Sequence, residues 1–147
     1  MENQFINRYN SFCKSLDILH QSCAADPKAM FVLGATARAY NLTFDLSWKV
    51  MKDILIKYFG IQDFATGSPR ESLRTSYQAG LISDDMWLEM LRVRNTLSHD
   101  YNGEVAMKYF HKIVTDYFDL FLQLKSKISK YYENGLLETA EKFSELN

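Results

Sequence analysis

The segment that decides the fold class reads FINRYNSFCKSLDILHQSC and spans residues 5–23. Large apolar side chains and a cysteine recur in it at alternating gaps of four and three residues. They are Phe5, Tyr9, Phe12, Leu16, Leu19 and Cys23. Because an α-helix turns by about 100° per residue, this spacing places them along one face. Such a face is typical of a helix that packs into a bundle, so we predict a helix over residues 5–23 in an all-α protein.

A second, longer helix is expected to begin at Asp26-Pro27. The aspartate can cap the N-terminus of that helix, and the proline suits the first helical position. Apolar and aromatic residues then continue at helical spacing from Leu33 to Tyr58, and Gly60 follows as a C-terminal stop.

Two shorter helices follow a loop. Ser68-Pro69-Arg70-Glu71 has the pattern of a capping box with proline at the first helical position, and Gly80 should end that helix. Ser83-Asp84-Asp85 is expected to cap a fourth helix, since acidic side chains suit the positive end of the helix dipole. The fourth helix should end near residues 98–101, because Asn102-Gly103 follows.

The last helical pattern runs from Ala106 to Tyr131, and Asn134-Gly135 breaks it. The chain shows no alternating strand pattern, long low-complexity linker or internal repeat. We therefore expect one all-α domain over residues 1–147, an antiparallel up-down four-helix bundle. The short third helix is an extra element within a connection, and residues 135–147 form a peripheral, weakly amphipathic helical tail. Aromatic residues beyond one stripe suggest either an oligomeric interface or a wide core.

The charge balance excludes one class of function. The chain has 147 residues, of which 17 are Lys or Arg and 18 are Asp or Glu, for a formal net charge of −1. A general nucleic-acid coat normally shows a strongly basic domain, so that function is not supported. A small, local basic site remains compatible with this balance.

The cysteines and the hydropathy bear on the compartment. Cys13 and Cys23 lie about 15 Å apart on the first predicted helix, which is too far for a disulfide. We interpret both as small core residues in a reducing compartment. The sequence shows no apolar signal region at its start and no run of about 18 apolar residues. We therefore expect a cytoplasmic protein that does not enter a membrane.

The candidate functional motif is Arg94-Asn95-Thr96-Leu97-Ser98-His99-Asp100-Tyr101. On a helical projection, Arg94 and Tyr101 fall in the middle of the apolar face of the fourth helix, where a charge is costly unless it is compensated. His99 lies about 140° around the helix from Arg94, so the two do not converge on one straight helix. We expect the site at a helix end, completed by unwinding at Ser98 or by a second subunit.

Two interpretations of this motif remain open. Arg94 can pair with an acid on a facing helix, for which Asp45 is a candidate. Alternatively, Arg94 can hold a phosphate while His99 removes the proton of a ribose 2′-hydroxyl, and together they can cleave a phosphodiester without a metal ion. Tyr101 is either a core tyrosine with a satisfied hydroxyl or a phenol that another enzyme can reach.

The motifs of several enzyme classes are absent from the sequence. Without GxGxxG, GxxxxGK[ST] or GxSxG, dinucleotide, P-loop and hydrolase-elbow chemistry are not supported. His20 and His111 lack metal-ligand spacing, no CxxC occurs, and no metal or cofactor is expected. Gly67-Ser68 is a weak nucleotidyltransferase motif without a visible pair of acidic metal ligands. We do not expect the chain to transfer nucleotides itself.

The run from Leu91 to Tyr101 contains the R-x4-H-x-Y pattern and resembles HEPN-domain proteins, more narrowly those called nucleotidyltransferase substrate-binding proteins. Further stretches agree in the same order and extend the similarity over roughly residues 5 to 125. They are Thr43-Phe44-Asp45-Leu46-Ser47-Trp48-Lys49, Ser68-Pro69-Arg70, Ala79-Gly80-Leu81-Ile82 and Trp87-Leu88-x-Met90-Leu91. The resemblance implies an antiparallel helical bundle that forms a homodimer, with a minimal nucleotidyltransferase (MNT) as its partner.

The resemblance also implies an activity. In related toxin–antitoxin pairs the HEPN protein is a metal-independent RNase toxin, and the MNT antitoxin silences it by adding AMP to the motif tyrosine. Arg94 and His99 would then be catalytic, Tyr101 would be the modified residue, and Asn95 and Asp45 would support the site. The family name implies an alternative, a non-catalytic accessory subunit that presents substrate to the transferase. A helical dimer that serves only as an interaction platform is a third hypothesis.

Overall fold

The computed structural model describes residues 4–61 and 67–133 and is helical throughout its ordered elements. The elements are α1 (Gln4–Ser22), α2 (Val32–Lys57), α3 (Pro69–Ala79), α4 (Met86–Leu97), α5 (Glu104–Lys112), the π-helical η1 (Ile113–Tyr117) and α6 (Phe118–Glu133). Within these two ranges no strand occurs, which confirms the predicted all-α class. None of the described helices combines the length and the apolar character that a membrane span requires.

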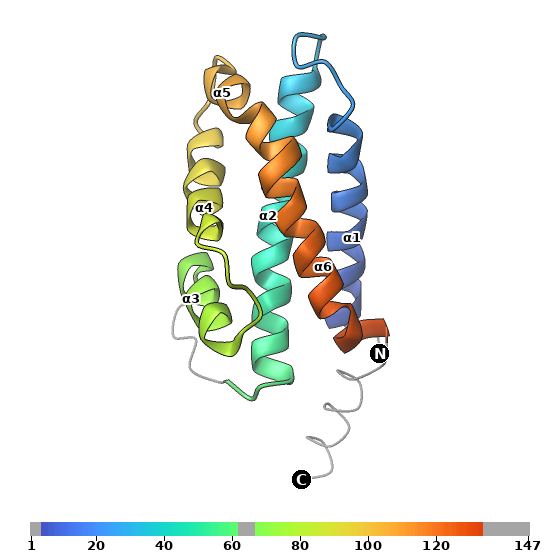
Figure 1. Ribbon diagram of the computed structural model, residues 1–147, viewed down its shortest axis with the longest axis vertical. Coiled ribbons are helices and arrows are strands. Elements are labelled where there is room, and N and C mark those ends of the chain that lie inside the picture. Colours follow the sequence, from blue (N-terminus) through green and yellow to red (C-terminus); the bar gives the residue numbers. More distant parts are fainter. Residues whose placement is uncertain (1–3, 62–66, 134–147) are drawn as a thin grey trace.

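The helices form an up-down bundle, as predicted (Figure 1). α1 and α2 run in opposite directions, α4 runs against α2, and the path from α5 through α6 returns along the bundle. The short α3 lies at the end of α4, so the two together make one side of the bundle. α2 is the central helix, because it contacts α1, α3, α4 and α5.

Aromatic side chains from every long helix meet in the core. The ring of Phe121 lies 6.5 Å from that of Phe12, 6.0 Å from that of Tyr40 and 5.7 Å from that of Trp87. All four side chains are almost fully buried. The Tyr40 hydroxyl donates a 2.7 Å hydrogen bond to the main-chain oxygen of Met90, which satisfies the polar end of a buried ring. Much of the aromatic excess therefore belongs to a wide core.

The second helix begins later than predicted. Asp26 does act as a local cap, since its Oδ1 accepts a 2.9 Å hydrogen bond from the Lys28 N–H. That turn does not continue, because Phe31 adopts a left-handed conformation with φ of 70° and the helix proper starts at Val32. A cap pattern specifies a turn, and only the following backbone decides whether the turn extends into a helix.

Side-chain caps and a glycine set the two ends of α3 and the start of α4. Ser68 Oγ accepts a 3.2 Å hydrogen bond from the Glu71 N–H, and Gly80 ends α3 with φ of 79°, as predicted. At α4 the cap comes from Asp84, whose Oδ1 accepts a 2.9 Å hydrogen bond from the Met86 N–H, while Asp85 makes no side-chain cap bond.

The predicted fifth helix is divided by a π-helical turn between α5 and α6. The side chains of Ile113 and Tyr117 are fully buried at the two ends of this turn. The apolar pattern runs through the turn without a break, so it could not reveal the change of winding. The predicted break at Asn134-Gly135 and the tail over residues 135–147 lie outside the described residues.

The cysteines differ from their predicted environment. Cys13 is partly buried against the core, but Cys23 is exposed in the turn after α1. Its thiol donates a weak 3.5 Å hydrogen bond to the Val114 main-chain oxygen. The prediction that Cys23 is a core residue was wrong, because α1 ends at Ser22 and the chain leaves the apolar face there.

Candidate functional site

Arg94 of α4 and Asp45 of α2 form a bidentate ion pair. Arg94 Nε donates to Asp45 Oδ1 at 2.9 Å, and Nη2 donates to Oδ2 at 2.7 Å. Each side chain is 30% exposed, so the pair lies at the edge of the core. The hydrogen bonds to Asp45 raise the pKa of Arg94 above its usual value. The charge on the apolar face of α4 is therefore compensated by the residue that the sequence suggested as its partner.

The third guanidinium nitrogen of Arg94 forms a hydrogen bond at the end of α4. Arg94 Nη1 donates to Ser98 Oγ at 3.0 Å, and Ser98 Oγ donates to the Arg94 main-chain oxygen at 3.2 Å. α4 ends at Leu97, and the His99 N–H donates a 3.1 Å hydrogen bond to the Thr96 main-chain oxygen in a tighter turn. The helix thus ends one residue before the predicted range of residues 98–101.

Asp100 fixes the path of the chain after the motif. Its Oδ1 accepts a 3.1 Å hydrogen bond from the Val105 N–H, and Oδ2 accepts a 2.9 Å hydrogen bond from the Ala106 N–H. The carboxylate satisfies two free donors at the start of α5, where the helix dipole also favours an anion. Sequence analysis had assigned Asp100 no structural role.

His99 lines a groove of about 480 Å³ that lies against α3, α4 and the start of α5. The groove is lined by two arginines, a histidine, two other polar residues and two aliphatic residues: Arg70, Leu91, Arg92, Asn95, Thr96, His99 and Val105. Arg92 and Asn95 are three residues apart and so share one side of α4, and His99 follows in the turn after the helix. Arg94 is not among the lining residues. The structure therefore brings His99 together with Asn95 and two arginines, and it places Arg94 with Asp45.

Tyr101 lies outside the apolar face on which the helical projection placed it. α4 ends four residues earlier, at Leu97, so the projection does not apply at position 101. Tyr101 is in the connection between α4 and α5, and it is 90% exposed. The prediction of a shared inward face with Arg94 was wrong. Of the two interpretations of Tyr101, the exposure excludes the core tyrosine and leaves an accessible phenol.

Arg70 is a residue of the groove that sequence analysis treated only as part of a capping box. A signal was present, because a cation in the first turn of a helix is opposed by the helix dipole and calls for another explanation. In the described part of the chain, the exposed Arg70 side chain makes no hydrogen bond or ion pair. Arg70 reaches the groove because α3 packs next to α4, a proximity that no local pattern indicates.

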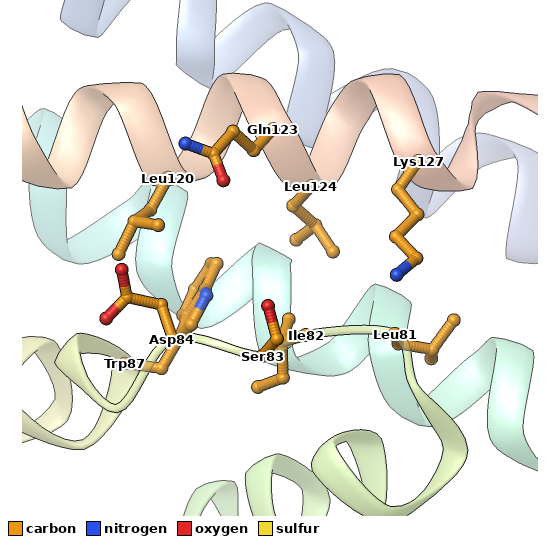
Figure 2. A pocket seen from close by; sticks show the side chains of 9 residues that line it. All are labelled: Leu81, Ile82, Ser83, Asp84, Trp87, Leu120, Gln123, Leu124 and Lys127. Carbon is orange, nitrogen blue, oxygen red and sulfur yellow. The ribbon is translucent and has the colours of Figure 1, made fainter.

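A separate pocket of about 210 Å³ lies near the other end of α4, between the α3–α4 connection and α6 (Figure 2). Its walls combine apolar side chains, such as Trp87 and Leu124, with polar ones. The polar side chains of Asp84 and Gln123 are engaged within the protein, by the Met86 N–H and by Asp119. Asp84 and Lys127 bring opposite charges to this pocket, whereas the groove at His99 brings together two arginines and a histidine.

Comparison with known proteins decides the family. The sequence profile of the family described as nucleotidyltransferase substrate binding protein like matches residues 7–130. The chain belongs to the nucleotidyltransferase substrate-binding protein-like family. The match includes all of α2, α3, α4 and α5, and hence both the Arg94–Asp45 pair and the groove. The family membership predicted from the ordered motifs is confirmed. A search of curated proteins found no match.

Proposed function

We propose that this member of the nucleotidyltransferase substrate-binding family is a HEPN-type endoribonuclease that needs no metal ion and is regulated by a nucleotidyltransferase. The observation that carries the proposal is the position of His99, whose side chain lines a groove with two arginines at the end of α4. A neutral imidazole in such a groove can accept a proton from a ribose hydroxyl while cations hold the phosphate. The family description supports the connection to a nucleotidyltransferase.

In the proposed reaction, His99 removes the proton of the ribose 2′-hydroxyl, and the 2′-oxygen attacks the adjacent phosphorus. The bond between phosphorus and the 5′-oxygen breaks, and the leaving oxygen takes up a proton from solvent. The products are a 2′,3′-cyclic phosphate and a 5′-hydroxyl end. Arg94 stabilises the negative charge that gathers on the phosphate oxygens in the transition state, as a guanidinium does well through paired N–H donors.

A second copy of the chain would supply the missing convergence of Arg94 and His99. Phe31, just before α2, and five residues of the outer side of α2 form a stripe with alternating gaps of four and three residues. The five residues are Ala35, Arg38, Leu42, Asp45 and Lys49. Phe31 is 82% exposed and Leu42 is 50% exposed, which is unusual for large apolar side chains. We propose that two copies pack through this stripe. Because Asp45 belongs to it, the Arg94–Asp45 pair of each copy would lie at the dimer interface.

The test of the ribonuclease is cleavage of a mixed-sequence RNA in the presence of a metal chelator. We expect the wild-type protein to produce fragments with cyclic phosphate ends, and His99→Ala to lose at least about 100-fold in rate. His111→Ala is the matched control, since His111 is exposed on α5 and does not line the groove. Equal, background-level cleavage by the wild-type protein and His99→Ala would refute the proposal.

One observation favours a second candidate function. Each of the three guanidinium nitrogens of Arg94 donates a hydrogen bond to Asp45 or Ser98, so within one chain three of its five N–H donors are engaged. This arrangement suits a structural arginine in an accessory subunit that presents substrate to a nucleotidyltransferase and cleaves nothing. For that function, RNA stays intact, and adding the chain changes the KM of the transferase for its substrate.

A further inference from the structure

Two arginines line the groove at His99, and neither is Arg94, which acts on the scissile phosphate in the proposed reaction. Arg70 comes from the first turn of α3, and Arg92 comes from the middle of α4. Both side chains are exposed, and both line the same groove. Two guanidinium groups that converge on one groove from different helices repel each other unless an anion lies between them.

The acidic residues around the groove neutralise this pair of arginines only in part. Glu89 lies 3.9 Å from Arg92, but both of its carboxylate oxygens accept hydrogen bonds from Lys112, at 2.8 and 3.0 Å. The carboxylate of Asp100 is occupied by the N-terminus of α5. Glu71 is adjacent to Arg70 in sequence but does not line the groove. The groove therefore has a local positive charge on a protein whose formal net charge is −1.

We infer that Arg70 and Arg92 bind successive phosphates of a single-stranded RNA segment and hold it across His99. This inference rests on the proposed ribonuclease function and assigns the residues that contact its substrate. Guanidinium groups bind phosphate through paired donors, and Asn95 adds a neutral donor on the same wall. The Thr96 hydroxyl already donates to the Arg92 main-chain oxygen. Leu91 and Val105 give the groove an apolar surface on which a base or ribose can rest.

Single-stranded RNA fits this groove better than a duplex does. A volume of about 480 Å³ is in the range of small-ligand sites and accommodates a short piece of one strand. Attack by a 2′-oxygen also requires it to come into line with the leaving 5′-oxygen, which a free strand permits and a regular A-form helix opposes. The contacts that the groove offers are directed to phosphate and to exposed bases, as in other single-strand sites.

The experiment measures binding without cleavage. A fluorescein-labelled 2′-O-methyl RNA has no free 2′-hydroxyl, so it reports binding by fluorescence anisotropy even if the protein is an active ribonuclease. We expect Arg70→Gln and Arg92→Gln each to weaken binding about 5- to 20-fold at low salt. Each should also lower the slope of log Kd against log salt by about 0.7, the value for one lost phosphate contact on a single strand. Arg74→Gln is the matched control, because Arg74 is exposed on α3 but does not line the groove.

The possible outcomes separate this inference from the function on which it rests. If the wild-type protein does not bind the probe, or if Arg74→Gln weakens binding as much as Arg70→Gln, the inferred phosphate contacts are wrong. Normal RNA cleavage by the Arg70→Gln and Arg92→Gln variants would overturn the inference and leave the ribonuclease in place. If the groove variants lose binding while the wild-type protein cleaves no RNA, the phosphate contacts stand and the catalytic proposal fails. Circular dichroism confirms that each variant is folded.

Discussion

Arg94 and Asp45 are 49 residues apart in the sequence, and two parallel hydrogen bonds join them across the α2–α4 interface. The pair turns a charge on the apolar face of α4 into a structural contact between two helices. It also positions the guanidinium against Ser98, at the point where α4 ends and the rest of the motif begins. Helix packing and the candidate chemistry therefore depend on the same side chain.

Replacing Asp45 by Asn tests the structural part of this role. The variant keeps the shape of the side chain but leaves the guanidinium, which is 30% exposed, without its negative partner. We expect the free energy of unfolding to fall by about 1–2 kcal/mol, less than for a fully buried pair because solvent screens this one. Urea unfolding measures the change, with Asp17→Asn on the exposed side of α1 as the control. Equal stability of the two variants would show that the pair contributes nothing.

The Tyr40 hydroxyl provides a test of core packing. Tyr40→Phe removes the hydrogen bond from the Tyr40 hydroxyl to the Met90 main-chain oxygen, which lies within α4. This should cost about 1 kcal/mol in unfolding free energy. Tyr132→Phe is the comparison, since the buried Tyr132 hydroxyl has no hydrogen-bond partner in the described part of the chain and its loss should be neutral or stabilising. Similar effects from both substitutions, read from thermal unfolding, would contradict this explanation.

Asp53 makes the stability of the bundle depend on pH. It is 4% exposed and receives a 2.6 Å hydrogen bond from Arg8, yet burial outweighs that partner and raises the pKa of Asp53 to about 7. Because the pKa is higher in the folded state than the ordinary 3.8, the folded protein binds the proton more tightly than the unfolded chain. The contribution of Asp53 protonation to the stability of the fold is complete below about pH 3.8, and it is lost as the pH rises toward 7.

Asp53→Asn should remove that dependence, since the amide does not titrate. We expect the unfolding free energy of the variant, relative to that of the wild-type protein, to increase by roughly 2–4 kcal/mol from pH 4 to pH 8. Denaturant unfolding at several pH values measures this difference. A constant difference across that range would mean that Asp53 does not change its protonation there.

Much of the fold follows from apolar spacing and from helix caps. The α1 stripe, the Ser68 cap and the Gly80 stop are local properties, so the sequence alone was sufficient to predict them. The start of α2 was not predictable in this way, because it depends on a left-handed conformation at Phe31, which is unfavourable for a side chain with a Cβ and is not encoded by a cap pattern.

The candidate site was predictable only where its residues are neighbours in the sequence. The R-x4-H-x-Y pattern identified Arg94, His99 and Tyr101. The helical projection separated Arg94 from His99, and in the structure only His99 lines the groove. The same projection placed Tyr101 wrongly, because it assumed that the helix continues beyond Leu97. Arg70 was missed since its place in the groove results from the packing of α3 against α4, which is a tertiary contact.

The exposure of Tyr101 leads to the last prediction, which concerns the proposed nucleotidyltransferase partner. Its side chain is 90% exposed and lies two residues after His99, so a second enzyme can reach the phenol without unfolding the bundle. In the proposed modification, the phenol oxygen attacks the α-phosphorus of ATP, an AMP group is transferred, and pyrophosphate leaves. An added phosphodiester near the groove would repel an RNA phosphate and block access to His99. We therefore expect modification to reduce the rate of cleavage at least about 10-fold.

Incubation with the partner, ATP and Mg²⁺, followed by intact-mass measurement, should show adducts of AMP size on the wild-type protein and none on Tyr101→Phe. Tyr109→Phe, a change at a partly exposed tyrosine of α5, is the control and should be modified normally. Adducts that persist on Tyr101→Phe, or cleavage that continues unchanged after complete modification, would show that Tyr101 is not the regulatory residue.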